Sequence, residues 1–493
     1  MRKNFFSYIE SKNNLLFLFF IFLLLCYRLV ICINYTPEIV TGETNNIWNA
    51  LQVANGKALY SDPEGTPFEI FQYTPLSQFP LIVIAKVLNP DSANYTYYVM
   101  MFGRMFNLFL NILTFYLVYL LLFTIFNVSK TLSLTAAFCG FGLLTHMSFA
   151  IRPDSMSLLF IMFSVYLFSK AYFQSKSFYF VFCGLFFAVS FFSKQDSFLI
   201  LSALGVYLII NKSWENFFVL SFSFIISFLL LLFLFYISFG KFFFLSIFGG
   251  LSVGYSISQA HYVFERFLTF YGALFYLGII FGYLIIKGCA PKKEGTFFLT
   301  LSLFSLIIAA IVSLKTGSGV SYFTPFVVYS IMQITYVLNY LNKGINKNII
   351  EKAVVYFTII VVSVFVFQQI YNYTSPFMKY AESKVKHDNI IRDFKGFRQD
   401  AMRENYIIFT YDQTLKLFLH KKTIFPNTEF YHVSRFSFEG YKKLNSSQKL
   451  THIIKNTDLG TSQFSTFEYY RIPLSKFKEK THVLNYIIYE YER

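Results

Sequence analysis

Long, uninterrupted apolar segments dominate this sequence and restrict what it can fold into. Residues 15–25 and 217–235 are almost entirely apolar, and similar segments recur as far as residue 371. A helix that crosses the hydrocarbon core of a bilayer needs roughly 20 mostly apolar residues. Only 14% of the 493 residues are charged, whereas about a quarter are charged in a typical soluble protein. The sequence therefore predicts a polytopic α-helical membrane protein.

Polar residues and turn formers divide the apolar segments into roughly eleven expected membrane spans. We place them at residues 14–33, 103–126, 131–150, 155–173, 178–193, 197–211, 217–239, 268–287, 296–314, 323–341 and 353–371. Lysines such as Lys130, Lys212 and Lys287 mark alternate connections, and the positive-inside rule assigns those connections to the cytoplasm. The N-terminus is then expected in the cytoplasm and the C-terminal region outside. A bacterial inner membrane is the expected location, because the exported region has no cysteines for disulfides and the sequence shows no eukaryotic retrieval signal.

Two regions outside the expected spans have secondary-structure patterns of their own. In the first outer loop, residues 34–102, the segment TGETNNIWNALQVANG predicts an interfacial amphipathic helix that ends at Asn55-Gly56. A second such helix is expected over residues 76–88. The C-terminal region has frequent charges and short apolar runs, which predict a small extracytoplasmic α/β domain. Its expected elements are strands at 406–410 and 483–491 and a short helix at 415–420.

The expected domains are thus a membrane domain, residues 1–371, and the α/β domain, residues 372–493. The five cysteines lie in or beside apolar segments, and none follows Cys289, which excludes a disulfide framework in the exported region. The net charge of +16 suits anionic lipid headgroups, and no nucleic-acid-binding motif accompanies it.

Glu43 is the first candidate for chemistry, because it follows the first span at the start of the expected interfacial helix. One interpretation is a first-turn acid favoured by the helix dipole, with Thr41 as the N-cap. The other is a general base at the membrane edge. Glu38 is a neighbouring candidate for the same role.

Arg152-Pro153-Asp154 lies between the third and fourth spans. Proline excludes a helical conformation for the residue before it and readily starts a helix, so Asp154 is expected in the first turn and Arg152 outside it. This could be a self-contained ion-paired cap. However, charges near a membrane are costly and usually functional.

Two further outer loops carry cations. Lys194 precedes Asp196 in SKQDS, and Lys315 precedes the glycine-rich GSGVSYF. Snorkelling and capping would also explain these residues. We expect the acids and cations of the outer loops to share one outward-facing pocket. Cations retained there suit a phosphate headgroup, and an adjacent carboxylate suits attack of a hydroxyl on a carbon that carries a phosphate leaving group.

This order of motifs resembles the GT-C superfamily of integral-membrane glycosyltransferases, which includes protein O-mannosyltransferases and aminoarabinose transferases. The resemblance rests on Glu43 followed by Asn55-Gly56 and Tyr60, on the Tyr-x-Pro-Leu element that begins at Tyr73, and on the RPD, KQD and GSGxxYF motifs. It covers most of the chain.

The resemblance implies an inverting transfer of a sugar from a polyprenyl-phosphate carrier to a glycan, lipid or protein acceptor. Glu43 would be the base, and Asp154 would orient the acceptor or the base. The residues expected to bind the lipid phosphate or sugar are Arg152, Lys194, Gln195, Lys315, Tyr322, Tyr73 and Glu38. No cofactor is expected, although a divalent metal stays open.

Two other functions stay open at this point. A transporter or flippase for a lipid-linked sugar would also need cations at a membrane face, but transporters usually contain repeats, and none is evident here. A non-catalytic, glycan-binding membrane scaffold would keep the same architecture, with the acids as helix caps and the cations as lipid anchors.

Overall fold

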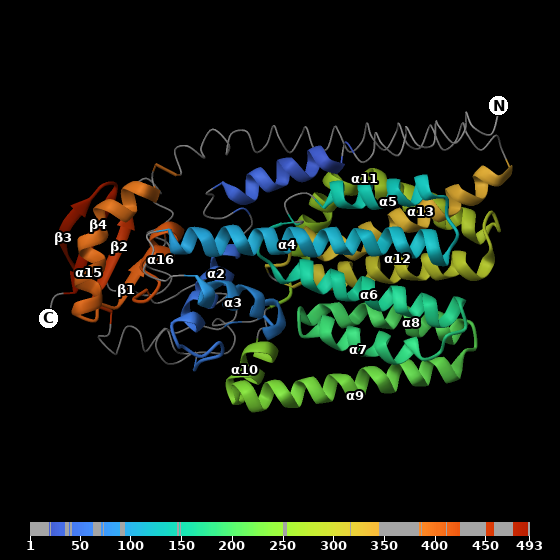
Figure 1. The fold of residues 1–493 in the computed structure, drawn as a ribbon, viewed down its shortest axis with the longest axis horizontal. Coiled ribbons are helices and arrows are strands. Elements are labelled where there is room, and N and C mark those ends of the chain that lie inside the picture. Colours follow the sequence, from blue (N-terminus) through green and yellow to red (C-terminus); the bar gives the residue numbers. More distant parts are fainter. Residues whose placement is uncertain are drawn as a thin grey trace. The chain divides into compact units, whose positions relative to one another are not determined.

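The structure is a computed structural model, drawn as a ribbon in Figure 1. Its residues divide into two compact units. We call Met1–Cys32, Met105–Leu234 and Tyr255–Thr374 the bundle unit, and Ile33–Arg104, Phe235–Gly254 and Ser375–Arg493 the α/β unit. The residues that the structure describes are 19, 21–34, 39, 42–62, 71, 73–88, 94–144, 147, 149–249, 254–315, 317–344, 384–385, 387–410, 412–423, 450–457 and 477–491.

The described part of the bundle unit is helical. After the apolar helix Ile21–Ile33, its elements are α4 (Tyr95–Leu120, shared with the α/β unit), η2 (Leu121–Ile125), α5 (Lys130–Leu143), α6 (Pro153–Phe173), α7 (Tyr179–Phe191), η4 (Gln195–Phe198), α8 (Leu199–Ile210), α9 (Trp214–Phe239, also shared), α11 (Ile257–Ile286), α12 (Lys292–Ser313), η5 (Val320–Phe323) and α13 (Thr324–Gly344). Helix α6 packs against α7, α8 against α12, and α13 against α5, α11 and α12.

Small and aromatic side chains set how closely these helices approach one another. Gly184 on α7 lies so near α9 that a Cβ there would be 2.6 Å from the backbone nitrogen of Phe224. Small residues at such contacts let membrane helices pack through their backbones. Phe126 fills the space beside α12 and α13, with its ring centroid 4.6 Å from that of Phe298 and 5.9 Å from that of Tyr336.

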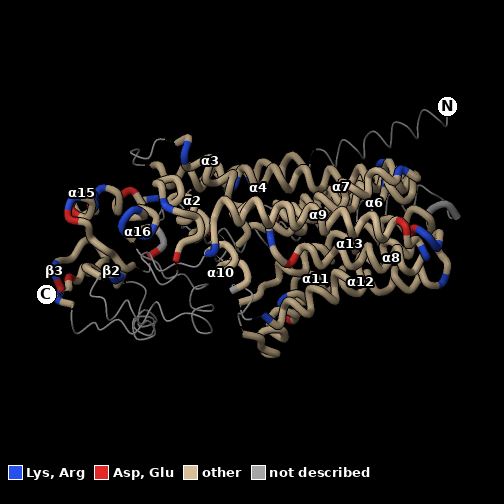
Figure 2. Tube along the Cα trace, turned by 90° about the horizontal axis from the view of Figure 1, so that it is seen from below, with Lys and Arg blue, Asp and Glu red and all other residues tan. Residues whose placement is uncertain are grey.

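The surface of the bundle unit suits lipid. In the most apolar stretch of α9 only 6% of the residues are buried, and in that of α11 only 11%. Most of their apolar side chains therefore face outward, as is expected of helices exposed to lipid. In Figure 2, α9 and α13 are free of charged residues along most of their length. Five described helices are long and apolar enough to cross a membrane.

The predicted spans between 103–126 and 323–341 each coincide with a described helix, and the fold class expected from the sequence is confirmed. The span predicted at 131–150 is too long, because α5 ends at Leu143 and its C-cap is Leu144. Helix α11 begins at Ile257, earlier than the predicted 268. The span at 353–371 lies outside the described residues, as does the predicted domain boundary at 372.

The α/β unit combines the first outer loop with the C-terminal region. Its described elements are α2 (Glu43–Ala54), η1 (Pro75–Ser77), α3 (Phe79–Val87), α10 (Lys241–Gly249), α15 (Lys395–Arg403), β1 (Ile408–Thr410), α16 (Gln413–Phe418), β2 (His452–Asn456), β3 (Phe477–Val483) and β4 (Tyr486–Tyr491). The sheet order is β1-β2-β4-β3. The β1–β2 pair is parallel, and the other two pairs are antiparallel.

The helices predicted in residues 41–56 and at 76–88, the strand at 406–410 and the short helix at 415–420 all appear, within a few residues of the expected bounds. The strand predicted at 483–491 is confirmed over β4, Tyr486–Tyr491, but its predicted start is too early. The chain turns at Leu484, where φ is +50°, and the segment belongs to the β3–β4 hairpin. Leucine is an unusual residue for a left-handed turn position, so no turn signal marked it.

Candidate functional site

Helix α2 places Glu43 at its first position. Gly42 is the N-cap, with φ of +91°, and it provides no side-chain cap. Glycine adopts this left-handed conformation without a steric penalty. The expected cap, Thr41, lies outside the described residues. Glu43 is 0% exposed, so this first-turn acid is not at the solvent surface.

Arg104 holds the Glu43 carboxylate by both oxygens. Arg104 Nε donates to Oε1 at 2.8 Å and Nη2 donates to Oε2 at 2.7 Å. The backbone N–H of Ile39 donates to Oε2 at 2.9 Å. Arg104 is also 0% exposed. This bidentate geometry fixes the orientation of the carboxylate as well as pairing its charge.

Arg104 is a site residue that sequence reasoning missed. It is the only charged residue in the predicted span 103–126. A lone ionisable residue inside an apolar span marks a functional position by default, with a partner to be found. That signal was present in the sequence, but the identity of the partner was not.

Around Asp154 the local prediction is confirmed. Arg152 has an extended backbone with φ of −139°, Pro153 opens α6, and Asp154 lies in the first turn. Arg152 Nε donates to Asp154 Oδ2 at 3.2 Å. Within this tripeptide, therefore, the arginine and the aspartate do form the ion pair that one of the two interpretations required.

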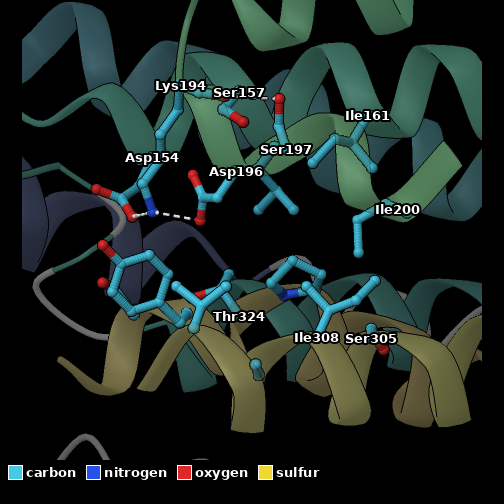
Figure 3. Close-up of a pocket in the computed structure, with 16 residues that line it drawn as sticks. Asp154, Ser157, Ile161, Lys194, Asp196, Ser197, Ile200, Ser305, Ile308 and Thr324 are labelled. Atoms are coloured by element: carbon cyan, nitrogen blue, oxygen red, sulfur yellow. Dashed lines mark hydrogen bonds and ion pairs between the residues drawn. The ribbon is translucent and has the colours of Figure 1, made fainter. Parts of the chain in front are cut away.

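Lys194 extends this pair into a cluster, which is drawn in Figure 3. Its Nζ donates to Asp154 Oδ1 at 2.9 Å and lies 3.2 Å from Asp196 Oδ2. The same Nζ is 4.1 Å from the centroid of the Tyr322 ring, within reach of a cation–π interaction. We call Arg152, Asp154, Lys194 and Asp196 the four-charge cluster. Its formal charges cancel.

The surroundings shift the pKa of Lys194, in the cluster, and of Tyr322 beside it. Burial would lower the pKa of Lys194, but Asp154 and then Asp196 outweigh it, and the pKa is held above its ordinary value. Burial raises the pKa of Tyr322. Lys194 is therefore a permanent cation at neutral pH, and Tyr322 keeps its proton.

A cavity of about 40 Å³ lies beside the cluster, between α6, α8, α12 and α13. Figure 3 shows Lys194 between Asp154 and Asp196 on one side of it, with Thr324 and Ile308 opposite. A water molecule needs roughly 10–15 Å³ of such volume. The cavity therefore has room for a few waters and not for a sugar, so a substrate would meet the charged rim rather than the interior.

The α/β unit contains a larger cavity of about 410 Å³. Its wall is apolar and aromatic, with contributions from Tyr60, Phe79 and Phe239, and Lys57 and Lys86 also line it. Tyr60 is buried and donates from its hydroxyl to the carbonyl of Tyr73 at 2.8 Å. An apolar wall with two cations suits an amphiphile that has an anionic headgroup.

The remaining predicted site residues are placed differently. Gln195 begins η4 but does not line the cavity beside the cluster, and neither does Lys315, whose backbone pairs with Tyr255. Tyr73 lies in the α/β unit, and Glu38 is outside the described residues. The structure thus brings together Arg152, Asp154, Lys194 and Tyr322. The expectation that Glu43 shares their pocket stays a prediction.

Solved structures of other proteins have a similar fold. ArnT from Cupriavidus metallidurans, in a crystal structure with bound undecaprenyl phosphate, matches with a TM-score of 0.65 at 10% identity, over 96% of this chain and 97% of that one. The oligosaccharyltransferase AglB from Archaeoglobus fulgidus, in complex with an inhibitory peptide and a dolichol-phosphate, matches with a TM-score of 0.50 at 12% identity, over 95% and 74% of the two chains. No curated protein matches by sequence.

These matches define the class: the chain is a multi-pass membrane protein with the GT-C fold, and the resemblance expected from its motifs is confirmed. More particularly, residues 97–239 match the model of the dolichyl-phosphate-mannose-protein mannosyltransferase family. That family and the matched structures are glycosyltransferases.

The described residues form no metal site, because no group of three or more His, Cys, Asp or Glu side chains among them could hold an ion. In the sequence, Asp62 and Glu64 are spaced like a pair of metal-binding acids, but Pro63 between them favours an ordinary turn; Glu64 lies outside the described residues. AglB from A. fulgidus has been crystallised with zinc and sulfate, and it matches with a TM-score of 0.52 at 12% identity, over 92% of this chain and 71% of that one. The expectation of a cofactor-free reaction stays a prediction.

Proposed function

We propose that this protein is an inverting glycosyltransferase that moves a sugar from a polyprenyl-phosphate carrier to an acceptor at the outer face of the membrane. The observation that carries the proposal is the fully buried Glu43 carboxylate, which Arg104 holds by both oxygens. Support comes from the full-length fold match to ArnT, a protein that binds undecaprenyl phosphate.

In the proposed reaction Glu43 takes the proton of the acceptor hydroxyl. The oxygen then attacks the anomeric carbon of the donor sugar, and the bond from that carbon to the phosphate oxygen breaks. The electron pair leaves with the polyprenyl phosphate, and the proton passes from Glu43 to solvent or phosphate. Arg104 contributes by orientation, because proton transfer needs the base within hydrogen-bond reach of the hydroxyl.

The four-charge cluster is proposed to bind the phosphate of the carrier, together with Lys315. Lys194 already contacts two carboxylates, so an incoming phosphate has to share it with Asp154 and Asp196. Arg152 is the more accessible cation, since its side chain is 21% exposed against 10% for Lys194. Cations fixed near the leaving group stabilise the charge that develops as it departs. The role proposed for Asp154 is to orient Arg152 and Lys194.

The larger cavity, lined by Lys57 and Lys86, offers a second place for the lipid carrier, because it combines volume, an apolar wall and positive charge. Binding there and at the four-charge cluster can be separated by charge reversal at Lys86 and at Arg152, with retention of radiolabelled polyprenyl phosphate as the measurement.

The proposal is tested by incubating membranes that contain the protein with labelled polyprenyl-phosphate sugars. We expect label to appear on an acceptor with the wild type, and the Glu43→Gln variant to lose transfer by about 100-fold or more, because a positioned general base contributes 10²–10⁴-fold. Glu215→Gln is the matched control. Glu215 is also a first-turn acid, on α9, but it is exposed to solvent.

Other outcomes decide between the functions. Unchanged transfer by Glu43→Gln would remove Glu43 from the mechanism. Movement of labelled lipid across sealed vesicles without covalent transfer would identify a flippase. Retention of glycan with neither transfer nor movement would identify a scaffold.

A further inference from the structure

Helix α2, which carries Glu43, has no exposed face in its first ten residues. Every residue from Glu43 to Gln52 is buried. The amphipathic pattern predicted one buried face, but the structure buries a second. On the first face Glu43 meets Arg104, and Asn46 accepts a hydrogen bond at 2.9 Å from Nε2 of Gln78.

The second face of α2 contacts the C-terminal segment 412–423. Trp48 Nε1 donates to Thr423 Oγ1 at 3.0 Å, and Gln52 Nε2 donates to the carbonyl of His420. These partners are 375 and 368 residues apart in sequence. Because Trp48 and Gln52 lie four residues apart, they are on the same side of the helix.

Lys416 makes the third contact on this face. Its Nζ donates to Asn45 Oδ1 at 2.9 Å and lies 5.2 Å from the centroid of the Trp48 ring. Lys416 is only 4% exposed. Removing an ammonium group from water is costly unless it is well paired, so a lysine buried here, against two residues of α2, points to a specific role.

The segment 412–423 is itself anchored to the sheet. Asp412 caps α16 through Oδ1, which accepts from the backbone N–H groups of Thr414 and Leu415 at 2.9 and 3.0 Å. Its other oxygen accepts from the hydroxyl of Tyr486, on β4, at 2.8 Å. A continuous set of buried polar contacts therefore runs from the sheet through α16 to α2.

We propose that Lys416 is a positioning residue: through Asn45 and Trp48 it fixes the orientation of α2, and thereby the position of the Glu43 carboxylate. The C-terminal segment then belongs to the catalytic assembly rather than to a separate accessory domain. In its kinetic form this inference rests on the proposed function, in which Glu43 is the base.

The Lys416→Met variant tests the inference. It keeps the apolar length of the side chain and removes the charge and the donor. We expect kcat for sugar transfer to fall by about 10- to 100-fold, because small misplacements of a catalytic group have effects of this size. The KM for the lipid-linked donor stays within about twofold. Lys416→Arg, which keeps the charge and the donors, restores most of kcat.

Lys422→Met is the matched control. Lys422 Nζ donates to Asn405 Oδ1 at 2.8 Å, so the type of bond is the same, but this bond is exposed and does not involve α2. We expect wild-type kcat and KM. If Lys416→Met does not fold, Asn45→Ala removes only the acceptor from α2 and is expected to lower kcat in the same way.

Amide hydrogen exchange gives a readout that needs no activity. Lys416→Met should speed exchange in peptides from α2 and leave peptides from β4 as in the wild type, whereas Lys422→Met should change neither. A wild type that transfers no sugar would contradict the proposed function and leave this exchange result to decide the positioning role. Folded Lys416→Met and Asn45→Ala variants with wild-type kcat and wild-type exchange in α2 would overturn the inference.

Discussion

The Glu43–Arg104 pair in the α/β unit and the four-charge cluster in the bundle unit use charge in different ways. The first is a one-to-one bidentate pair with both side chains 0% exposed. In the second, Lys194 is shared by two carboxylates, and the side chain of Arg152 stays 21% exposed. A closed pair fixes one carboxylate in place. A shared and partly open cluster can exchange a partner for an incoming anion.

Breaking the closed pair should have the largest effect. Arg104→Met leaves the Glu43 carboxylate buried without its guanidinium partner, and removing one member of a buried pair costs about 3–5 kcal/mol. We expect thermal unfolding in detergent to occur at a clearly lower temperature, and sugar transfer to be lost. Arg104→Lys, which keeps the charge but not the bidentate fork, should lie between the wild type and Arg104→Met. Wild-type stability and transfer in Arg104→Met would show that the pair has no structural or catalytic role.

Substitutions in the four-charge cluster should have smaller effects on transfer, and its two aspartates should differ. Asp154 bonds both Arg152 and Lys194, whereas Asp196 contacts only Lys194 within the cluster. Asp154→Asn should therefore lower kcat/KM by about tenfold, and Asp196→Asn by about threefold or less, since a hydrogen bond to a charged group contributes roughly 1.5–3 kcal/mol when it is buried. Initial rates of transfer at varied donor concentration measure both. Equal effects of the two substitutions would contradict the assignment of Asp154 as the orienting carboxylate.

Acid should loosen the surroundings of the closed pair through His420, which packs against Gln52 of α2. Burial lowers the pKa of His420 to about 3, below the ordinary value of about 6.5. The unfolded chain then binds the proton first as the pH falls, so this contribution to stability is complete above about pH 6.5. The free energy of unfolding then decreases by about 1.4 kcal/mol per pH unit as the pH falls from about 6.5 towards 3.

Unfolding followed by tryptophan fluorescence from pH 7 to pH 5 measures this loss. His420→Gln, which does not titrate, should reduce the slope by about 1.4 kcal/mol per pH unit. Burial also lowers the pKa of His452, to about 4, and the pKa of His387, so these two histidines account for a remaining slope. Replacement of the exposed His482 by Gln, on β3, is the control and should leave the slope as in the wild type. A slope as steep in His420→Gln as in the wild type would assign the acid sensitivity to other groups.

The two regions also differ in how much of their geometry the sequence predicted. The geometry of Arg152, Pro153 and Asp154 was predictable, because proline acts on its immediate neighbours. The membrane helices were predictable because apolar length is a local property. Arg104 was visible as an isolated charge, but its partner is 61 residues away. Nothing local indicated that Trp48 would meet Thr423 across 375 residues, or that Leu484 would start a turn.

Glycosyl transfer by a carboxylate at position 43 is tested most directly in a single-turnover reaction of the purified protein with undecaprenyl-phosphate-linked sugar and a membrane extract as acceptor. The wild type should release undecaprenyl phosphate and label the acceptor together. Glu43→Gln should retain the lipid with wild-type affinity and release none of it. Release and labelling by Glu43→Gln at the wild-type rate would contradict the account.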